Sequence, residues 1–514
     1  MMDGAGEIST DITMQLTKSE EGMILTLRPD EAWLKDEKRV YPVIIDPVVT
    51  TSLNSADIND VHVSKGSPTT NYIYSTILKT GWGTSSDVNR IYFRFLNLPT
   101  LSSADMVTDA VFTLTQKTSH TSAARQLNLV EVLTTWVNST LTWNNQPLGT
   151  AVPVSSNVED YAMIQGSSGT SHQWNITRLV QQWYNSGVNH GFMLEDSAPG
   201  TTSASYNEYY SSEASASRPM VIISYRNTSG LEPYWTYRSQ SIGRAGTVYT
   251  HDVTGNLVLV HSDAGLSGNR MPIAIRHVYN SNDLSNMGYG KGLRLNIHQE
   301  VSTVVVGSIT YYRYIDGDGT SHYFPKVGSS PYEDEDGLGY QLVENTASTT
   351  ARYVITDKDD NKMEFNSAND LVKIIDRNNN TMTITYASGK VASVADGSGR
   401  TMTLTYSGNL QKITDVAGRH IQYSYDANGN LTQITYPDNL ASIYAYSGSL
   451  LASVKNHDGY ELVVGYSDSL PKRVVSLTEK NGATLGTTLS MTYGDNFTTF
   501  TDFNNRSLQL QFTD

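Results

Sequence analysis

The segment TMTITYASGKVASVADGSGR, residues 381–400, is followed at once by TMTLTYSGNLQKITDVAGR, residues 401–419, and HIQYSYDANGNLTQITYPDN, residues 420–439. In each copy a run of alternating apolar and polar residues ends in a tyrosine, and a short turn containing glycine follows. Strict alternation with β-branched and aromatic residues predicts a half-buried strand, and the turn predicts a hairpin. The feature that decides the fold is therefore a hairpin that recurs about every 20 residues.

The second strand of each hairpin carries two apolar residues three apart, such as Val391 and Val394. Because strand faces repeat every two residues, we expect a β-bulge there or burial of both faces. One hairpin cannot bury its apolar face alone, so successive hairpins must stack side by side. The pattern predicts a long antiparallel sheet with these structural residues in its repeats: Phe365, Tyr386, Tyr406, Tyr425, Gly429, Tyr446 and Tyr466.

The copy YDANGNL, residues 425–431, resembles the YD repeat of RHS proteins, whose pattern is Y-D-x-x-G-N-L. Other copies depart from that pattern at the position of Asp426, where they carry Ala387, Ser407, Ser447 and Ser467. The resemblance implies a β-sheet that spirals into a hollow shell. In bacterial members, the polymorphic-toxin and wall-associated types, it implies that the shell encloses a C-terminal toxin. Self-cleavage and toxicity then reside C-terminal to the repeats.

Composition sets the limits of the function. The chain has 514 residues, a formal net charge of −15, 39 glycines, 32 tyrosines and no cysteine. This length predicts about two to four domains, and the composition favours an all-β fold. The negative charge argues against a nucleic-acid partner, and the absence of cysteine excludes disulfides and thiolate metal sites. No apolar run approaches the ~18 residues of a membrane span, and the first residues lack the pattern of a signal peptide.

Residues 50–226 contain seven or more short strand-like runs separated by polar loops, which predicts a jelly-roll-like β-sandwich. An amphipathic helix interrupts them, with Gly187 as its stop and with these residues on one face: Ile176, Leu179, Val180 and Trp183. The predicted order of units is a lead-in β-hairpin region (1–49), the sandwich (50–226), a linker (227–250), a region preceding the repeats (251–350) and the repeats (351–514).

Four motifs of the sandwich resemble the DNRLRE-type domain, a β-sandwich class related to carbohydrate-binding modules of bacterial surface proteins. These motifs are DVNRIYFRF (87–95), LTWNNQP (141–147), ITRLVQQW (176–183) and GFML (191–194). Further along, TGNL (254–257) and RHVYNS (276–281) resemble the segment that precedes RHS repeats. Both resemblances reinforce an all-β chain with an N-terminal sandwich and a C-terminal repeat sheet.

Candidate ligand-binding residues in the sandwich are Trp82, in the loop-like TGWGTSS, and Tyr209 and Tyr210, in a serine-rich stretch. Sugar rings stack on exposed aromatic side chains, whereas the tryptophans in the recurring motifs are expected to anchor the core. Aromatic residues that merely lie in loops are the alternative interpretation of all three.

Candidate catalytic or metal-binding residues can also be explained as residues of hairpins and turns. His251, Asp252, His261 and Asp263 offer a metal or acid–base set, but they also fit a hairpin beside its loops. The acidic loops at 316–319 and 357–361 lack the glutamate that a calcium-binding EF-hand loop requires at position twelve, so we interpret them as turns. We therefore expect no catalytic residue, no metal and no cofactor.

The sequence as a whole predicts a non-catalytic fragment of a large secreted or surface-displayed bacterial RHS-repeat protein, cut at both ends. The expected partners are a cell-wall or extracellular polysaccharide and a downstream effector domain of the same polypeptide. Two alternatives remain open: a carbohydrate-binding adhesin whose repeats form a stalk, and a polysaccharide-active enzyme with paired carboxylates.

Overall fold

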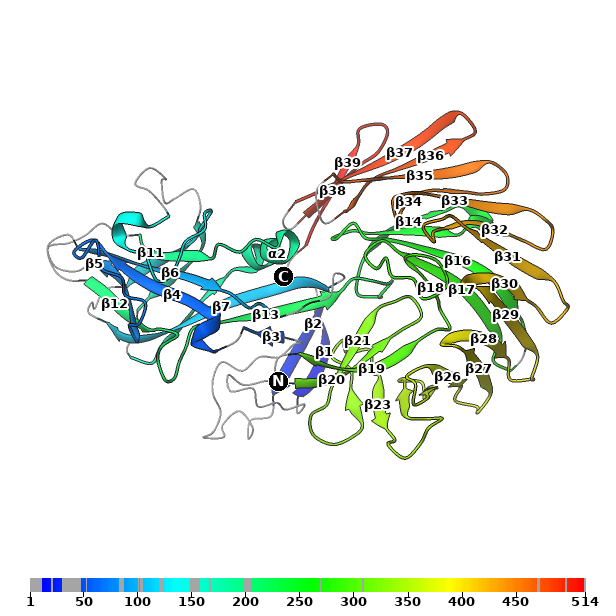
Figure 1. Cartoon of the computed structure of the whole chain (residues 1–514), viewed down its shortest axis with the longest axis horizontal. Helices are drawn as coiled ribbons and strands as arrows, with labels where there is room; N and C mark the ends of the chain where they lie inside the picture. The colour runs from blue at the N-terminus through cyan, green and yellow to red at the C-terminus, as the bar shows by residue number, and fades with distance from the viewer. Residues whose placement is uncertain are drawn as a thin grey trace.

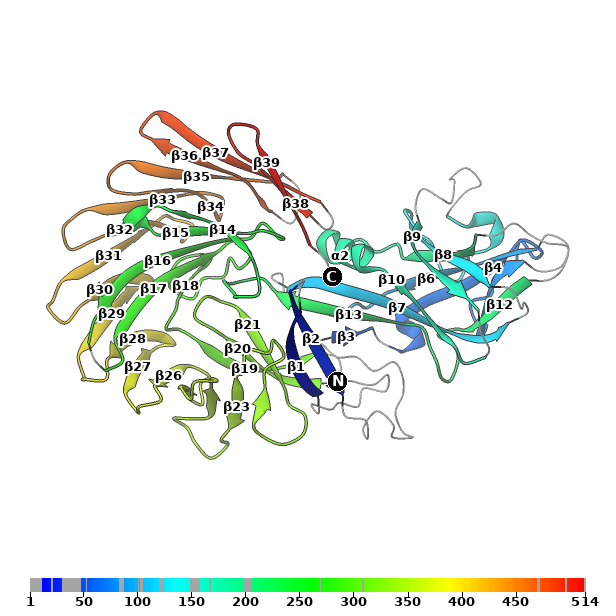
Figure 2. The same cartoon turned by 180° about the vertical axis from the view of Figure 1, so that it is seen from behind.

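The computed structural model describes residues 12–19, 22–29, 48–51, 53–82, 87–99, 101, 105–119, 124–147, 158–165, 168–197, 205–268, 270–306, 309–468, 472–494 and 497–512. Figures 1 and 2 show two lobes, an N-terminal sandwich and a strongly curved repeat sheet. Among the described residues, no helix combines the length and apolar character that crossing a membrane requires. Both lobes are built from β-strands, so the all-β prediction is confirmed.

A hairpin lies near the start of the chain, as expected for the lead-in region. Strand β1 (Ile12–Ser19) pairs along its whole length with β2 (Gly22–Pro29). The rest of the predicted lead-in region, residues 1–11 and 30–47, lies outside the described residues.

The sandwich is one sheet folded into two layers by a long strand. Its strands are β3 (Val48–Thr50), β4 (Ile58–Ser64), β5 (Ile77–Trp82), β6 (Val88–Phe95), β7 (Asp105–Ser119), β8 (Arg125–Glu131), β9 (Val158–Ile164), β10 (Ser171–Asn175), β11 (Phe192–Asp196), β12 (Ser205–Tyr210) and β13 (Met220–Asn227). The order is β3-β13-β7-β12-β5-β6-β11-β8-β9, with β10 beside β7 and β4 beside β6. The first part of β7 pairs with β13 and β10, and its last residues pair with β12. Strand β7 thus joins the layers.

Aromatic rings fill the space between the layers. Phe112 lies at the centre, with ring centroids 4.9 Å from Phe93, 4.8 Å from Phe192 and 5.6 Å from Trp174. Helix α2 (Thr177–Ser186) buries the expected face and ends at Gly187, whose φ of 68° is a conformation that glycine adopts without a Cβ clash. The helix prediction is therefore confirmed.

A five-stranded inner sheet follows the sandwich. It is formed by β14 (Tyr237–Ser241), β15 (Thr247–His251), β16 (Leu257–Leu266), β17 (Ile273–Asn280) and β18 (Leu293–Leu295), in that order. The prediction of a linker at 227–250 is wrong for its second half, because β14 and most of β15 fall there. Their residues pair with one another and with β16, and this pairing satisfies a backbone that looks like a polar loop in isolation. A three-stranded sheet comes next: β19 (Glu300–Val306), β20 (Ile309–Ile315) and β21 (Ser321–Pro325).

Within the part of the chain that the structure describes, the repeat sheet has 18 strands, and each pairs antiparallel with the next one in the sequence. These are β22 (Tyr332–Glu333), β23 (Gln341–Glu344), β24 (Tyr353–Thr356), β25 (Lys362–Phe365), β26 (Leu371–Ile375), β27 (Thr381–Ala387), β28 (Lys390–Ala395), β29 (Thr401–Ser407), β30 (Asn409–Thr414), β31 (His420–Tyr425), β32 (Leu431–Thr435), β33 (Ala441–Ser447), β34 (Leu450–Lys455), β35 (Tyr460–Tyr466), β36 (Val474–Asn481), β37 (Thr484–Tyr493), β38 (Phe497–Thr501) and β39 (Ser507–Gln511). Figure 1 shows this sheet curving around the inner sheet.

A β-bulge recurs once per repeat, just at the aromatic residue. Thr385 pairs with Ser393 but Tyr386 pairs with Val391, so Ala392 is the extra residue. The same shift precedes the other repeat aromatics: Phe365, Tyr406, Tyr425, Tyr446 and Tyr466. The extra residue turns the two apolar residues of each second strand toward one side, and Val391 and Val394 are both fully buried. The expected bulge is confirmed, and bulges bend a sheet and increase its twist.

One apolar core lies between the two sheets. It combines residues of the inner sheet, such as Leu259 and Ile275, with residues of the repeat sheet, such as Leu404, Ile413 and Ile434. The concave face of the repeat sheet is therefore filled by the inner sheet over these strands.

Candidate functional site

The bulges of the repeat sheet face the inner sheet and hold it. At four of them a backbone N–H near the start of the second strand donates a hydrogen bond inward. The acceptors are Gln299 O for Leu371 (3.0 Å), Gly288 O for Leu410 (2.8 Å), the hydroxyl of Tyr279 for Leu451 (3.0 Å) and Gly255 O for Val474 (2.9 Å). A bulge leaves backbone groups without a ladder partner, and four of the repeats use such a group to attach to the inner sheet, its loops or the segment that follows it.

The repeat tyrosines pack on the shared core, and two of them connect neighbouring repeats. Each is half-buried against the shared core, and Phe365 is fully buried. The hydroxyl of Tyr406 donates to Val391 O at 2.8 Å, and that of Tyr466 donates to Leu451 O at 3.1 Å, both in the preceding repeat. These contacts fit the predicted packing role of the tyrosines, which remains a proposal for their function.

The turn after Tyr425 is organised by an aspartate. Asp426 Oδ1 accepts from the N–H groups of Asn428 (2.9 Å) and Asn430 (2.8 Å), and Oδ2 accepts from the Asn430 side chain at 2.8 Å. Burial alone raises the pKa of Asp426, but these hydrogen bonds hold it below its usual range. Gly429 has a φ of 83°. This geometry is the physical reason for the D-x-x-G-N spacing.

The core between the sheets contains a buried charged network. Asp263, on β16, has a fully buried side chain and accepts from Nδ1 of His277 (2.9 Å), Nδ1 of His261 (3.2 Å) and the hydroxyl of Tyr423 (2.8 Å). Nε2 of His261 lies 2.8 Å from the hydroxyl of Tyr436 on the repeat side. Burial alone raises the pKa of Asp263, but the two histidines hold it well below its usual range. The network joins the inner sheet to repeats about 160 residues away.

The four candidate reactive residues thus separate into two structural groups. His261 and Asp263 belong to the network above. His251 Nδ1 accepts from the N–H groups of Val253 (3.1 Å) and Thr254 (3.2 Å), and Asp252 pairs with Arg238 at 3.3 Å. Sequence reasoning missed Tyr423 and Tyr436, because nothing in a single strand marks which tyrosine meets a histidine.

The ligand candidates of the sandwich occupy different faces. Tyr209 is not in a loop: it lies on β12, opposite Leu78 of β5, and its ring is fully buried in the core. That expectation was wrong because pairing of β12 with β5 and β7 turns a serine-rich stretch into a core strand. Tyr210, the next residue, points to the other face and is half-buried, and Trp82 is half-buried at the end of β5.

The outward face of β12 carries a row of aromatic and charged residues. Tyr206 and Tyr210 are half-buried there, with Glu208 between them. Lys79 pairs with Glu208 at 3.3 Å and lies 5.4 Å from the centroid of the Tyr206 ring, and Lys117 lies 6.0 Å from that of Tyr210.

The acidic loop at 316–319 forms a turn, and further carboxyl groups lie close to it. Oδ1 of Asp316 accepts from the N–H groups of Asp318, Gly319 and Thr320, all at 3.0 Å. Burial raises the pKa of Glu232 to about 7, and burial together with the charge of Asp316 raises that of Asp318 to about 8. Carboxylates are therefore crowded beside this loop, at a place that no local motif marks.

Three family models match the chain. Carbohydrate-binding module family 96 matches residues 51–225, a domain of unknown function (DUF6531) matches 251–324, and the RHS repeat matches 405–441. Of these three, one is a family of carbohydrate-binding modules, one is a repeat family, and the third has no known function.

Curated relatives share only the matched part. The tRNA nuclease WapA of Bacillus subtilis (strain 168) is 30% identical over 243 residues, which is 45% of this chain and 10% of the relative. The tRNA3(Ser)-specific nuclease WapA of Bacillus spizizenii has the same values. The chain spans about a tenth of the length of these relatives. The crystal structure of TcdB2-TccC3-Cdc42 aligns with 54% of this chain and 17% of that chain, at 10% identity and a TM-score of 0.23.

Motifs, serial strand order and family models lead to the same conclusion. The repeat pattern around residue 425 falls within the RHS repeat match, and the sandwich motifs fall within the carbohydrate-binding match. The chain contains RHS/YD repeats and, N-terminal to them, a β-sandwich of the carbohydrate-binding-module type.

Proposed function

We propose that this chain is a non-catalytic part of a large secreted or surface RHS-repeat protein of the polymorphic-toxin type. Its repeats form the start of a shell around a C-terminal effector, and its sandwich binds a cell-wall or extracellular glycan. The observation that carries the proposal is the serial repeat sheet, in which each hairpin pairs with the next and each repeat adds one bulge.

The regular bulge supports enclosure over a straight stalk. A bulge bends and twists its strand, and one bulge per repeat on the same side accumulates curvature in one direction. The inner sheet and the segments that flank its strands are held on the concave side by backbone N–H groups at four of the bulges. Continued for more repeats, the same construction closes a wall around a volume.

The relatives support an effector of the toxin class. Their names describe tRNA nucleases, and their length leaves most of each protein outside the matched part. We expect the nuclease-like or other toxic activity of the whole protein to reside outside the sandwich and the repeats.

Enclosure is tested on the polypeptide encoded by the complete gene. Limited proteolysis of the intact protein should spare the effector, and heat or denaturant should expose it to the same protease. An effector that is cleaved or active at full rate in the intact protein, or a gene that encodes no further repeats or effector, refutes enclosure. In that case, an adhesin with a repeat stalk becomes the better explanation.

The glycan site is proposed for the outward face of β12, with Trp82 as a separate candidate. Tyr206 and Tyr210 are four residues apart, or about 13 Å along the strand, and charged side chains accompany both rings. Aromatic faces flanked by polar groups suit stacking and hydrogen bonding to sugar rings.

Retention on immobilised cell-wall and extracellular polysaccharides tests this site. We expect Tyr206→Ala and Tyr210→Ala to weaken retention about tenfold each, and Trp82→Ala to weaken it if that ring also contacts the glycan. Tyr161→Ala is the matched control, because Tyr161 is exposed on the distant strand β9. A parent chain that no polysaccharide retains, or equal loss in the Tyr161 control, refutes the proposal.

A further inference from the structure

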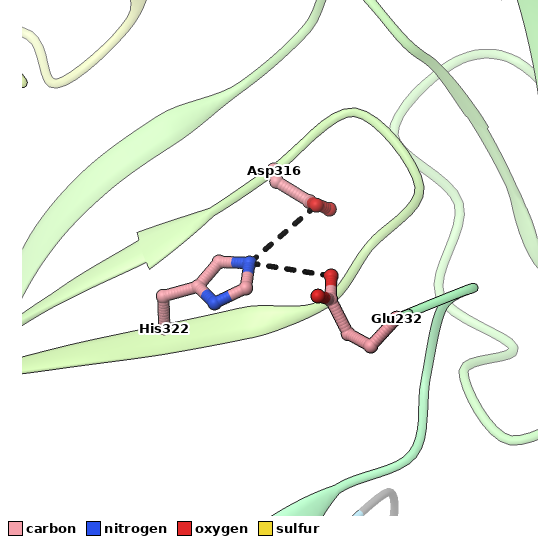
Figure 3. A group of neighbouring side chains, drawn as sticks. All are labelled: Glu232, Asp316 and His322. Atoms are coloured by element: carbon pink, nitrogen blue, oxygen red, sulfur yellow. Dashed lines mark hydrogen bonds and ion pairs between the residues drawn. The ribbon is translucent and has the colours of Figure 1, made fainter. Parts of the chain in front are cut away.

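Three side chains from separate segments converge where the sandwich leads into the second lobe (Figure 3). Glu232 lies between β13 and β14, Asp316 directly follows β20, and His322 lies on β21. Nε2 of His322 is 3.5 Å from Asp316 Oδ2 and 3.6 Å from Glu232 Oε1. One ligand atom from each residue lies within 4.8 Å of the others.

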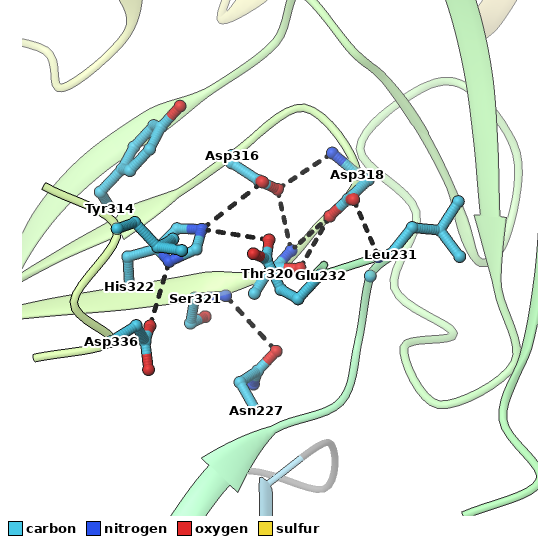
Figure 4. Close-up of polar contacts among 12 residues, drawn as sticks. Asn227, Leu231, Glu232, Tyr314, Asp316, Asp318, Thr320, Ser321, His322 and Asp336 are labelled. Carbon is cyan, nitrogen blue, oxygen red and sulfur yellow. Dashed lines mark hydrogen bonds and ion pairs between the residues drawn. The ribbon is translucent and has the colours of Figure 1, made fainter. Parts of the chain in front are cut away.

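The ring of His322 is held so that Nε2 faces the two carboxylates. On its other side, Nδ1 lies 3.1 Å from Oδ2 of Asp336 (Figure 4). Asp336 also pairs with Arg226 at 3.1 Å. The ring packs against Tyr314 at a centroid distance of 5.5 Å. A carboxylate on the second ring nitrogen is the usual companion of a metal-binding histidine, because it fixes the tautomer and the ring orientation.

The two distances to Nε2 are long for hydrogen bonds, which are typically about 2.7–3.2 Å. They are close to the separation of two ligand atoms that share a tetrahedral zinc ion, roughly 3.3–3.5 Å for metal–ligand bonds of about 2.0–2.1 Å. Asp316 is prepared for such a role, because Oδ1 is occupied by three backbone N–H groups and Oδ2 faces His322.

The excess of acidic side chains around His322 also favours a bound cation. The carboxyl groups of Glu232, Asp316, Asp318 and Asp336 lie around His322 (Figure 4). Arg226 pairs with Asp336. Four carboxyl groups thus face two basic side chains, so acidic groups are in excess around His322. Glu232 and His322 are 7% and 1% exposed, so water screens this imbalance poorly.

We propose that Glu232, Asp316 and His322 bind a divalent first-row transition-metal ion, with Zn²⁺ or Mn²⁺ as the class of occupant. The imidazole ligand favours these ions over Ca²⁺, which takes oxygen ligands. A cavity of about 400 Å³, lined by Asp316, Gly317, Tyr314 and Tyr340 among others, gives solvent access to Asp316. Water from this cavity completes the coordination.

The ion would have a structural role at the junction of the lobes. Glu232 belongs to the segment that leaves the sandwich, whereas Asp316 and His322 belong to the β20–β21 hairpin of the second lobe. Tyr225 of β13 and Tyr323 of β21 already touch there, with ring centroids 6.3 Å apart. A shared ion would fix the sandwich to this hairpin.

The test uses the whole chain, stripped with a chelator, dialysed and titrated with Zn²⁺, Mn²⁺ and Ca²⁺ separately. We expect one equivalent of Zn²⁺ or Mn²⁺ to bind and no comparable site for Ca²⁺. At a free concentration of about 100 times Kd, the melting temperature of the transition involving the junction should rise by about 5–10 °C.

His322→Gln and Glu232→Gln should each abolish that equivalent and the thermal shift. Glu300→Gln is the matched control, because His298, Glu300 and Asp370 form a second group of one histidine and two carboxylates. In that group Nδ1 of His298 faces the hydroxyl of Tyr289 at 2.8 Å instead of a carboxylate. The control should keep full binding.

Asp336→Asn provides an independent readout that does not remove a ligand. It should keep the stoichiometry and weaken the affinity about 10–100-fold, because it removes the group that orients His322. If His322→Gln fails to fold, Glu232→Gln and Asp336→Asn decide the matter. No bound equivalent in the parent, or an equivalent that persists in Glu232→Gln, overturns the proposal.

Discussion

The substitution Asp263→Asn tests whether the buried network joins the inner sheet to the repeats. Asp263 accepts hydrogen bonds from His261, His277 and Tyr423 with no solvent around its side chain. Asparagine has the same size but no charge. Its NH2 group is a donor, and it would replace a carboxylate oxygen that accepts hydrogen bonds from neighbouring donors. A charged or donating group of the histidine pair then loses its partner in the core.

The expected cost follows from the burial. Removing one partner of a buried ion pair costs about 3–5 kcal/mol, because the remaining group stays desolvated. For a lobe of this size, 1 kcal/mol corresponds to about 2–4 °C in melting temperature. We therefore expect the transition of the repeat lobe to fall by roughly 6–20 °C. The unfolding curve is analysed by transitions, because a chain with two lobes need not melt in one step.

Calorimetry and hydrogen exchange provide the assay. Amides of β16 and β17 should lose protection in the variant, while those of the sandwich should not change. Asp359→Asn is the matched control, since it removes the same charge from an exposed turn and should change stability by less than about 0.5 kcal/mol. A repeat-lobe transition within about 2 °C of the parent, with unchanged exchange in β16 and β17, would show that the network does not hold the sheets together.

The pH dependence has a definite sign. The pKa of Asp263 lies below its usual range in the folded chain, so its stabilising effect is fully present above the unfolded value of about 3.9. That effect is lost as the pH falls through the folded pKa. The difference between the parent and Asp263→Asn should thus narrow as the pH falls below about 4.

Three further predictions concern other parts of the chain. Tyr406→Phe removes the hydroxyl that donates to Val391 O at 2.8 Å, and should lower the unfolding free energy by about 1 kcal/mol in urea titrations; no change would mean that the bond contributes nothing net. Gly429→Ala forces a side chain into a φ of 83° and should cost about 1–2 kcal/mol by the same measurement, whereas a stabilised variant would contradict the left-handed turn. Burial raises the pKa of Asp60 to about 6, so its ionisation disfavours folding as the pH rises from about 4 to 6. Asp60→Asn should therefore stabilise the sandwich by about 1–3 kcal/mol at pH 8 and have little effect at pH 4, and the reverse order would refute the sign.

Local patterns predicted most of the repeat sheet. Alternation ending in Tyr386, the glycine turn after it and the apolar pair Val391 and Val394 are all separated by a few residues. The strand, the turn and the bulge each depend on residues that are close in the sequence, so they can be predicted from a single repeat. The same holds for helix α2, whose apolar spacing and terminal Gly187 are adjacent in the chain.

Prediction failed where distant segments meet. Tyr209 looks like a loop residue until β5 and β7 pair on either side of it, and residues 237–250 look like a linker until β16 pairs with β15. In both cases a partner strand outside the local window satisfies the backbone and covers the side chain.

The sequence by itself determined the strand period, the bulge and the family of the repeats, because these depend on neighbours within one hairpin. Only the tertiary structure decided which polar residues meet in the core. Asp263 finds Tyr423 at a separation of 160 residues, and Glu232 finds His322 across the junction of two lobes. A charged residue in an isolated strand carries no mark of its partner, since the energy of a buried pair arises only when folding removes water from both.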